Sequence, residues 1–235
     1  MYSKPQKLFA QFIGTFALVF FGAGSVCADQ FLRAGSNGQA GLGLLGVALA
    51  QGLAMSVVVV ALGAIGGAHF NPAITAGFWV TRRLSTIDTI LYWVAQLAGA
   101  VTASYALRLL PVDVWGPVQL GTPDLANGIS RTSGMIFEAI PTFFLVLVVF
   151  AATSDERVAF NSTAGFAIGL TITAGALFGG PFTGAALNPA RALGPALAAN
   201  HWTNHGVYWV GPMAGGVAAA WLYDAVFLRK SDRAR

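Results

Sequence analysis

Long apolar stretches separated by short polar ones make up most of this chain. A helix needs about 20 mainly apolar residues to cross the hydrocarbon core of a bilayer. Six stretches meet that length, and we predict membrane-spanning helices over residues 8 to 28, 41 to 63, 87 to 108, 133 to 152, 161 to 180 and 206 to 228. Two further apolar stretches, 74 to 80 and 192 to 199, are too short to span and are predicted to form half-helices.

The tripeptide Asn-Pro-Ala stands at the start of both short stretches, as Asn71-Pro72-Ala73 and as Asn188-Pro189-Ala190. Asn is a preferred N-cap, and Pro is tolerated at the first helical position, where its missing N–H would be unpaired anyway. Each copy is therefore predicted to begin a helix, and the two copies mark equivalent points of two halves.

The two motifs belong to a longer internal repeat. Gly52-Leu53 recurs as Gly169-Leu170, and Tyr92-Trp93-Val94 recurs as Tyr208-Trp209-Val210, in the same order around each motif. Such recurrence indicates duplication. We interpret residues 1–235 as one domain with repeats over about 8–110 and 131–228. Because each repeat holds an odd number of spans, the second is inverted in the membrane, and the half-helices enter from opposite sides with their N-termini meeting near the midplane.

Composition and charge agree with a membrane protein. The chain is 56% hydrophobic and 9% charged, against about 25% charged in a typical soluble domain. The first apolar stretch follows two lysines as a secretion signal does, but its length favours a span. With both termini in the cytoplasm, the positive-inside rule is satisfied, because that side then holds Lys4, Lys7, Arg82, Arg83, Arg157, Arg229, Lys230, Arg233 and Arg235. The net charge of +4 follows from topology, so no nucleic-acid partner is expected.

The residues around both tripeptides resemble those of one channel family. They read Gly67-Ala68-His69-Phe70-Asn71-Pro72-Ala73 and Thr183-Gly184-Ala185-Ala186-Leu187-Asn188-Pro189-Ala190-Arg191. With them, the chain resembles the aquaporin, or major intrinsic protein, superfamily over almost its whole length. The resemblance implies an all-α membrane protein with six transmembrane helices and two half-helices around a pore, assembled as a homotetramer. It also implies that the partners are the lipid bilayer, water and small neutral solutes.

The chemistry of the predicted pore follows from its residues. A helix N-terminus carries about half a positive charge and several unpaired N–H groups. Two such ends facing each other oppose cations, including hydronium. The amides of Asn71 and Asn188 can donate to the oxygen of a passing molecule, which then accepts poorly within a chain of waters that conducts protons. Backbone carbonyls of residues 65 to 70 and 182 to 187 are expected to supply acceptors along the path.

Arg191 directly follows the second tripeptide, inside apolar sequence. A charge at that depth costs about 2.5 to 3.5 kcal/mol and usually has a function. The family resemblance implies that Arg191 belongs to the selectivity filter, together with Gln51, Ala176 and Ala185. Water-selective members usually have an aromatic residue at the first of these other positions and a histidine at the second. Because two alanines cannot narrow the aperture as those side chains do, we predict a wider and more polar filter.

The resemblance leaves the solute open. Glycerol facilitators also admit a larger solute, but they carry Asp where this chain has Ala192. Small filter residues resemble those of plant nodulin-like channels and their bacterial relatives, whose substrates include uncharged metalloid hydroxides. The hypothesis is a passive channel for water and small polyols or metalloid hydroxides, with a strictly water-selective aquaporin as the alternative.

Three more polar side chains fall near the motifs. His69, two residues before the first motif, is placed on the approach to the pore, where its ring contacts solute or packs. Glu138 and Gln11 occupy equivalent places in the two halves. In the family, glutamates near these positions support the half-helix loops through hydrogen bonds. Gln11 supplies a neutral amide instead, which questions the symmetry of that support.

Several other functions are disfavoured. No His, Cys or carboxylate cluster has metal-ligand spacing, and no nucleophile stands beside a base, so the sequence predicts no metal, no cofactor and no enzyme. A secondary transporter also uses inverted repeats but needs a coupling-ion site. A purely structural membrane protein would leave vesicles impermeable. Short termini without a targeting extension favour a multi-pass protein of a prokaryotic plasma, or inner, membrane.

Overall fold

The computed structural model describes residues 2–110, 115–155 and 163–228 and is helical over most of that length. Its long helices are α1 (Lys4–Gly35), α2 (Gly43–Gly66), α4 (Thr86–Arg108), α5 (Arg131–Ser154), α6 (Ala164–Thr183) and α8 (Val207–Tyr223). A π-helical segment, η2 (Asp224–Leu228), extends α8, and a single 3-10 turn, η1 (Gln119–Gly121), lies in the long connection before α5.

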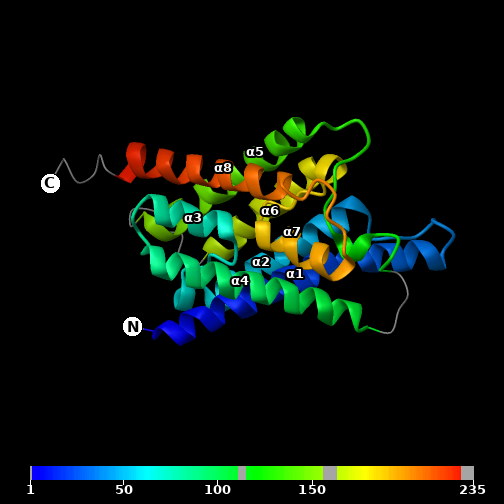
Figure 1. Ribbon diagram of the computed structural model, residues 1–235, viewed down its shortest axis with the longest axis horizontal. Helices are drawn as coiled ribbons and strands as arrows, with labels where there is room; N and C mark the ends of the chain where they lie inside the picture. Colours follow the sequence, from blue (N-terminus) through cyan, green and yellow to red (C-terminus); the bar gives the residue numbers. More distant parts are fainter. Residues whose placement is uncertain (1, 111–114, 156–162, 229–235) are drawn as a thin grey trace.

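Within the described residues, six helices are long and apolar enough to cross a membrane, which confirms the six predicted spans. Helix α1 extends beyond the predicted 8 to 28 at both ends. The predicted start of the fifth span, at 161, lies outside the described residues, as do Arg157 and the four basic residues of 229–235. The start of α1 and the end of η2 lie at the same end of the bundle (Figure 1), as an even number of spans requires.

Two short helices, α3 (Pro72–Val80) and α7 (Pro189–Ala199), are the half-helices predicted from the sequence. Both begin with the proline of their motif at the first position, and both motif prolines and alanines are buried. Asn200 caps the C-terminus of helix α7. It has a left-handed backbone (φ 53°), and its N–H bonds back to carbonyls of the last turn.

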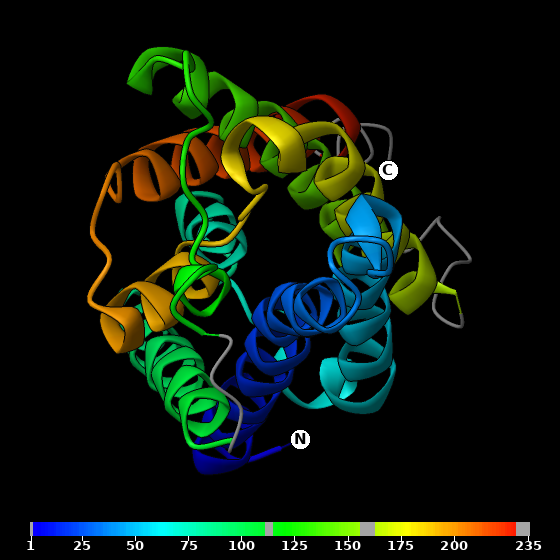
Figure 2. The same ribbon diagram turned by 90° about the vertical axis from the view of Figure 1, so that its right-hand side faces the viewer.

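The long and short helices together form a ring. Helices α1 and α2, α2 and α6, α6 and α5, and α5 and α8 pack against each other, and α1 also packs on α4. The remaining side is closed by α3, which packs on α8, and α7, which packs on α4. Figure 2 looks along the bundle and shows this arrangement around its centre. The two half-helices therefore complete a ring that the six spans leave open between α4 and α8.

Close approach between α2 and α6 depends on paired glycines. A Cβ on Gly52 would lie 2.5 Å from the carbonyl oxygen of Gly169, and a Cβ on Gly169 would collide with the carbonyl of Gly52. Small residues of this kind let membrane helices pack backbone to backbone. This contact holds the backbones of α2 and α6 close together.

The outside of the bundle is apolar. Large side chains that are more than half exposed include Phe9, Leu45, Val57, Ile87, Val94, Leu170 and Trp221. A water-soluble protein of this size would not present so many, because exposed apolar patches drive association. This surface suits lipid or another protein, whereas the polar side chains described next lie inside.

Candidate functional site

The two Asn-Pro-Ala segments meet inside the bundle. Each asparagine Oδ1 accepts the N–H of the alanine in its own motif, at 2.8 Å for Asn71 and 2.9 Å for Asn188, so both residues cap their helices. The side-chain amide nitrogen of each asparagine donates to the loop that precedes the other motif. Asn71 Nδ2 donates to the carbonyl of Leu187 at 2.8 Å, and Asn188 Nδ2 donates to the carbonyl of Phe70 at 3.0 Å. One N–H of each amide is left for a third partner.

Three cavities lie around these asparagines and the segments next to them. An outer cavity of about 270 Å³ and a narrow one of about 10 Å³ share Gln51 and Arg191 as lining residues. The narrow cavity is also lined by both asparagines and has room for about one water molecule. An inner cavity of about 410 Å³ begins at His69, on the other side of Asn71. The shared residues join the outer and narrow cavities into one path as far as the asparagines, and the inner cavity, which shares no lining residue with them, begins two residues before Asn71 in the chain.

The outer cavity brings together three of the four predicted filter residues. Gln51 from α2, Ala176 from α6 and Arg191 from α7 all line it. Among the described residues, none forms a hydrogen bond with the Gln51 side chain, which is 6% exposed. Ala185 lines none of the three cavities, and its Cβ faces Gly179 of α6. The part of Ala185 in a filter stays a prediction.

Arg191 is buried, with 3% of its surface exposed. Its Nη1 donates to the carbonyl of Gly121 at 2.8 Å, while its Nε has no partner among the described residues. Gly121 has a left-handed backbone (φ 71°), and a Cβ there would lie 2.7 Å from the carbonyl of Ala23 in α1. Only glycine fits this position, so the η1 turn brings its carbonyl to the guanidinium.

Glu138, fully buried in α5, supports the loop before α7. One carboxylate oxygen accepts the Thr183 hydroxyl at 2.6 Å and the Ala186 N–H at 3.0 Å, and the other accepts the Leu187 N–H at 2.8 Å. The loop it holds contains left-handed backbone at Ala185 (φ 45°) and Leu187 (φ 52°). Such conformations cost roughly 1–3 kcal/mol each and persist when their surroundings fix them.

Gln11 supports the loop before α3 through hydrogen bonds from its side-chain amide. Its Oε1 accepts the Phe70 N–H at 2.9 Å, and its Nε2 donates to the Gly66 carbonyl at 2.8 Å. Gln96 of α4 joins it, donating from Nε2 to the same Gln11 oxygen at 2.8 Å and to Thr75 Oγ1 at 2.9 Å. Sequence reasoning missed Gln96 and Thr75. A glutamine inside an apolar span is the signal that could have found the first.

Some carbonyls expected along the path are already used. Internal hydrogen bonds occupy one lone pair on each of Gly66, Phe70, Thr183 and Leu187. The carbonyls of residues 67–69 and 184–186 accept no hydrogen bond from the described part of the chain. The free acceptors, which also include the Ile65 carbonyl, are therefore fewer than the two full segments.

The loops at the outer end form a polar cluster that the sequence did not reveal. Asp124 lines the outer cavity, and its carboxylate contacts His201 Nε2 at 2.8 Å and accepts from Asn204 Nδ2 at 3.0 Å. Arg131 Nε in turn donates to Asn204 Oδ1 at 3.0 Å. These bonds join the segment after η1 to the loop that follows α7.

His205 in the same loop gives a pH-dependent prediction. Burial lowers its pKa, and its Nε2 accepts the Trp209 indole N–H at 3.1 Å, so the fold favours the neutral ring. A histidine whose folded pKa is lowered costs stability as pH falls through its unfolded pKa of about 6.5. In detergent, the melting temperature of the wild type should therefore fall more between pH 7.5 and 5.5 than that of His205→Gln, which keeps an acceptor but does not titrate. Parallel melting curves for the two proteins would contradict this.

Within the described residues, no group of three His, Cys, Asp or Glu side chains lies close enough to hold a metal ion. What the site offers is a path with two asparagine amides at its centre, an arginine at its outer end and free carbonyls on both approaches. That arrangement can bind small polar molecules.

Comparisons with known proteins agree with this geometry. Residues 2–223 match the model of the family described as major intrinsic protein. A probable aquaporin, TIP3-2 of Arabidopsis thaliana, is 43% identical over 226 residues, which covers 93% of this chain and 82% of the relative. The aquaporin NIP1-1 of Zea mays is 40% identical over 221 residues, covering 94% of this chain and 74% of the relative.

Among solved structures, the X-ray structure of the aquaglyceroporin from Plasmodium falciparum superposes with a TM-score of 0.81 at 24% identity, covering 98% of this chain and all of that one. At this identity the likeness speaks for the fold alone. Together with the family match, which covers nearly the whole chain, it leads to one assignment: this multi-pass membrane protein belongs to the major intrinsic protein family, the aquaporin channels, which are not enzymes.

Proposed function

We propose that this aquaporin-family chain is a passive channel for water and small uncharged solutes, polyols or metalloid hydroxides, that excludes ions and protons. The observation that carries the proposal is the outer cavity, where Gln51 has no partner within the described part of the chain, Ala176 adds only a methyl group and Arg191 supplies donors. An aperture with this lining offers both a donor and an acceptor to a hydroxylated solute and leaves room for its carbon skeleton.

Ion exclusion is proposed to arise at two places. The N-termini of α3 and α7 approach each other at the asparagines, so their partial positive charges add where the path is narrow. Arg191 adds a full charge close by. A neutral molecule pays no such electrostatic cost, and it can exchange hydrogen bonds with the asparagine amides and the free carbonyls.

A strictly water-selective channel is the second candidate, and one observation favours it. The cavity between Gln51 and the asparagines holds only about 10 Å³, which is the space of a single water. A polyol must widen that point, whereas water does not.

Restoring a narrow filter separates the two candidates. In liposomes, Gln51→Phe combined with Ala176→His should lower glycerol and arsenous acid permeability by at least about 10-fold, because a bulky pair leaves no room for a solute larger than water. Water permeability should change far less. Ala176→Ser, which keeps a small side chain, is the matched control and should keep solute flux. Equal solute permeability in the wild type and the double variant would contradict the wide-filter proposal.

The proposed setting is the inner, or plasma, membrane, with both termini in the cytoplasm and the two halves related as inverted repeats. Supporting this, the basic residues Lys7 and Arg83 lie at the inner cavity, whereas Asp29 and Asp124 line the outer one. In a Cys27→Ser background, a thiol at Gln39 should react with an impermeant maleimide on intact cells, and one at Arg82 only after lysis. The reverse labelling would overturn the orientation.

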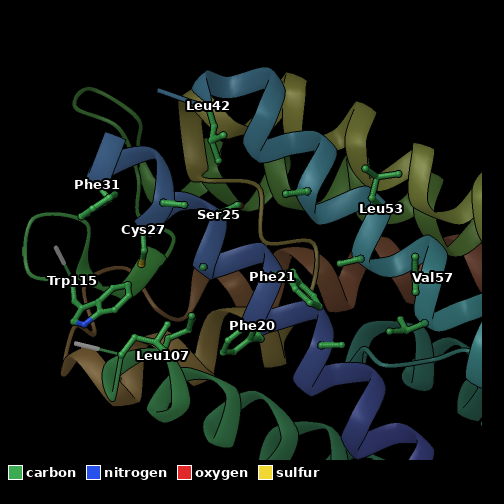
Figure 3. Close-up of a pocket in the computed structure, with 17 residues that line it drawn as sticks. Phe20, Phe21, Ser25, Cys27, Phe31, Leu42, Leu53, Val57, Leu107 and Trp115 are labelled. Atoms are coloured by element: carbon green, nitrogen blue, oxygen red, sulfur yellow. The ribbon is translucent and has the colours of Figure 1, made fainter. Parts of the chain in front are cut away.

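We further propose that the chain assembles as a homotetramer in which a neighbouring copy covers an apolar groove between α1, α2 and α4. The groove encloses about 800 Å³ and is lined by aromatic and aliphatic side chains (Figure 3), among them Phe21, Leu53 and Leu107. A second exposed apolar face carries Ile140, Phe144, Phe166 and Leu170 on α5 and α6. Repeated contact between the two faces closes a four-membered ring when each copy is turned by a quarter turn from the last. Light scattering in mild detergent should give four chains per particle, and one chain with bound lipid would contradict this.

A further inference from the structure

The His69 ring has one nitrogen that the fold leaves free. His69 is 3% exposed and lies between Phe78 and Tyr92, with ring centroids 4.3 and 5.4 Å away. Its Nδ1 contacts Thr75 Oγ1 at 3.1 Å. Its Nε2 has no partner among the described residues, lies beside Gly67, and is not among the atoms sealed from solvent. Both residues line the inner cavity, so Nε2 opens onto the path.

Whether Nε2 donates or accepts there depends on a chain of hydrogen bonds that starts at the backbone. Gln11 can be oriented in one way only, because its amide donates to the Gly66 carbonyl and its oxygen accepts the Phe70 N–H. Turning the side-chain amide over would set oxygen against oxygen and N–H against N–H. The Gln11 oxygen therefore faces Gln96.

Gln96 is oriented by Gln11. Its Nε2 lies 2.8 Å from the Gln11 oxygen and must be the group that donates there, since its own oxygen in that place would repel the other. The second N–H of the same amide then points to Thr75 Oγ1, 2.9 Å away. This orientation leaves Gln96 Oε1 buried without a partner among the described residues, and the bonds made on the other side of the amide offset that cost.

The Thr75 hydroxyl determines which nitrogen of the His69 ring carries the proton. Its oxygen accepts from Gln96, and its single hydroxyl proton goes to the Asn71 carbonyl at 3.1 Å. If the proton pointed to His69 instead, two oxygens would face each other at 3.1 Å without a hydrogen between them. The Thr75 oxygen is therefore an acceptor toward His69, and Nδ1 must carry the ring proton.

We propose that Gln96 and Thr75 are positioning residues that fix His69 as the Nδ1–H tautomer, so that its Nε2 lone pair forms a binding station for solute O–H or N–H groups at the inner end of the path. The inference rests on the proposed passage of small hydroxylated solutes. It adds a fixed acceptor on the cytoplasmic side that complements the donors of Arg191 and the two asparagines. A hydroxylated solute that leaves Asn71 then meets an acceptor next.

Nitrogen NMR of histidine-labelled protein in liposomes reads the tautomer without any flux measurement. The chain has only three histidines, so His201→Gln and His205→Gln assign the His69 signals. The wild type should show a protonated Nδ1 and an unprotonated Nε2 at neutral pH. A mainly Nε2-protonated or doubly protonated ring would overturn the proposal, and this result needs no variant at the site.

Variants at Thr75 test the cause. Thr75→Val removes the acceptor for Nδ1–H and should shift the tautomer toward Nε2–H, whereas Thr75→Ser should restore the wild-type spectrum. Thr142→Val is the matched control, because that buried hydroxyl donates only to a carbonyl of its own helix. A Thr75→Val spectrum like that of the wild type would count against the hydrogen-bond chain.

Added glycerol separates this inference from the proposed function. Glycerol should shift the Nε2 signal of the wild type by donating a hydrogen bond to that nitrogen. In the double variant Gln51→Phe with Ala176→His, glycerol added only at the outer side of the channel should leave the signal unchanged. The expected tautomer without any glycerol response would reject the station and the solute route while keeping the positioning role. A wrong tautomer with normal glycerol flux would reject the inference alone.

Discussion

Replacing Glu138 by alanine is expected to abolish folded channel. The carboxylate accepts three hydrogen bonds from the loop before α7, from Thr183, Ala186 and Leu187. Each donor left buried without a partner costs about 1–3 kcal/mol, so the loss is about 3 kcal/mol or more, which is a large share of the stability of a typical domain. The left-handed backbone at Leu187 would also lose its support, and with it the carbonyl that binds Asn71.

Size-exclusion profiles and water permeability in liposomes measure this effect. Glu138→Gln keeps one acceptor oxygen but turns an amide N–H toward a donor, so an intermediate loss is expected. Gln11→Glu is the matched change in the other half and should fold with the carboxyl protonated, because one oxygen can still accept the Phe70 N–H and the O–H can donate to the Gly66 carbonyl. A monodisperse Glu138→Ala channel with wild-type water flux would show that the loop does not depend on this side chain.

Replacing Arg191 by valine is expected to open the channel to protons and small cations. At about 4 Å and an effective dielectric constant of about 20, one charge opposes another by about 4 kcal/mol, and in bulk water by about 1 kcal/mol. Removing it should raise cation leak by between about 5-fold and 1000-fold. The wild-type guanidinium is held beside the path by the Gly121 carbonyl, so its charge acts at a fixed place.

A pH-sensitive dye inside liposomes, with valinomycin present to clamp the potential, records the proton leak. Arg191→Lys is the control, because it keeps the positive charge but loses the planar guanidinium group. Its proton leak should be much smaller than that of the valine variant. A valine variant as tight as the wild type would mean that the half-helix N-termini exclude cations on their own.

Local sequence signals were enough to predict much of the architecture. Hydropathy gave the six spans, and the Asn-Pro pairs gave the first residues of α3 and α7. These features depend on residues near each other in the chain: a cap, a proline without an N–H, a run of apolar side chains. The motifs also predicted that Asn71, Asn188 and Arg191 lie together, and all three line the narrow cavity, while their role in conduction stays a prediction.

Apart from the loop support expected from Glu138 and Gln11, the contacts that hold the site were not foreseen, because they join residues far apart in sequence. Gln11 meets Gln96, and Arg191 meets Gly121, across 85 and 70 positions of the chain. Nothing local in Gly121 distinguishes it from the many other glycines of this chain. For Ala185 the local signal was misleading. Its spacing to the motif suggested that it lines the pore, whereas its backbone is left-handed and its methyl group lies toward Gly179.

Stopped-flow light scattering of the purified protein in liposomes tests the central proposal most directly. Vesicles are shocked first with an impermeant sugar and then with glycerol, and arsenous acid uptake is assayed in the same preparation. The account predicts fast shrinkage with sugar, recovery of volume with glycerol and uptake of arsenous acid above that of empty vesicles. Fast water flux with neither solute entering would contradict the wide filter built on Gln51, Ala176 and Arg191.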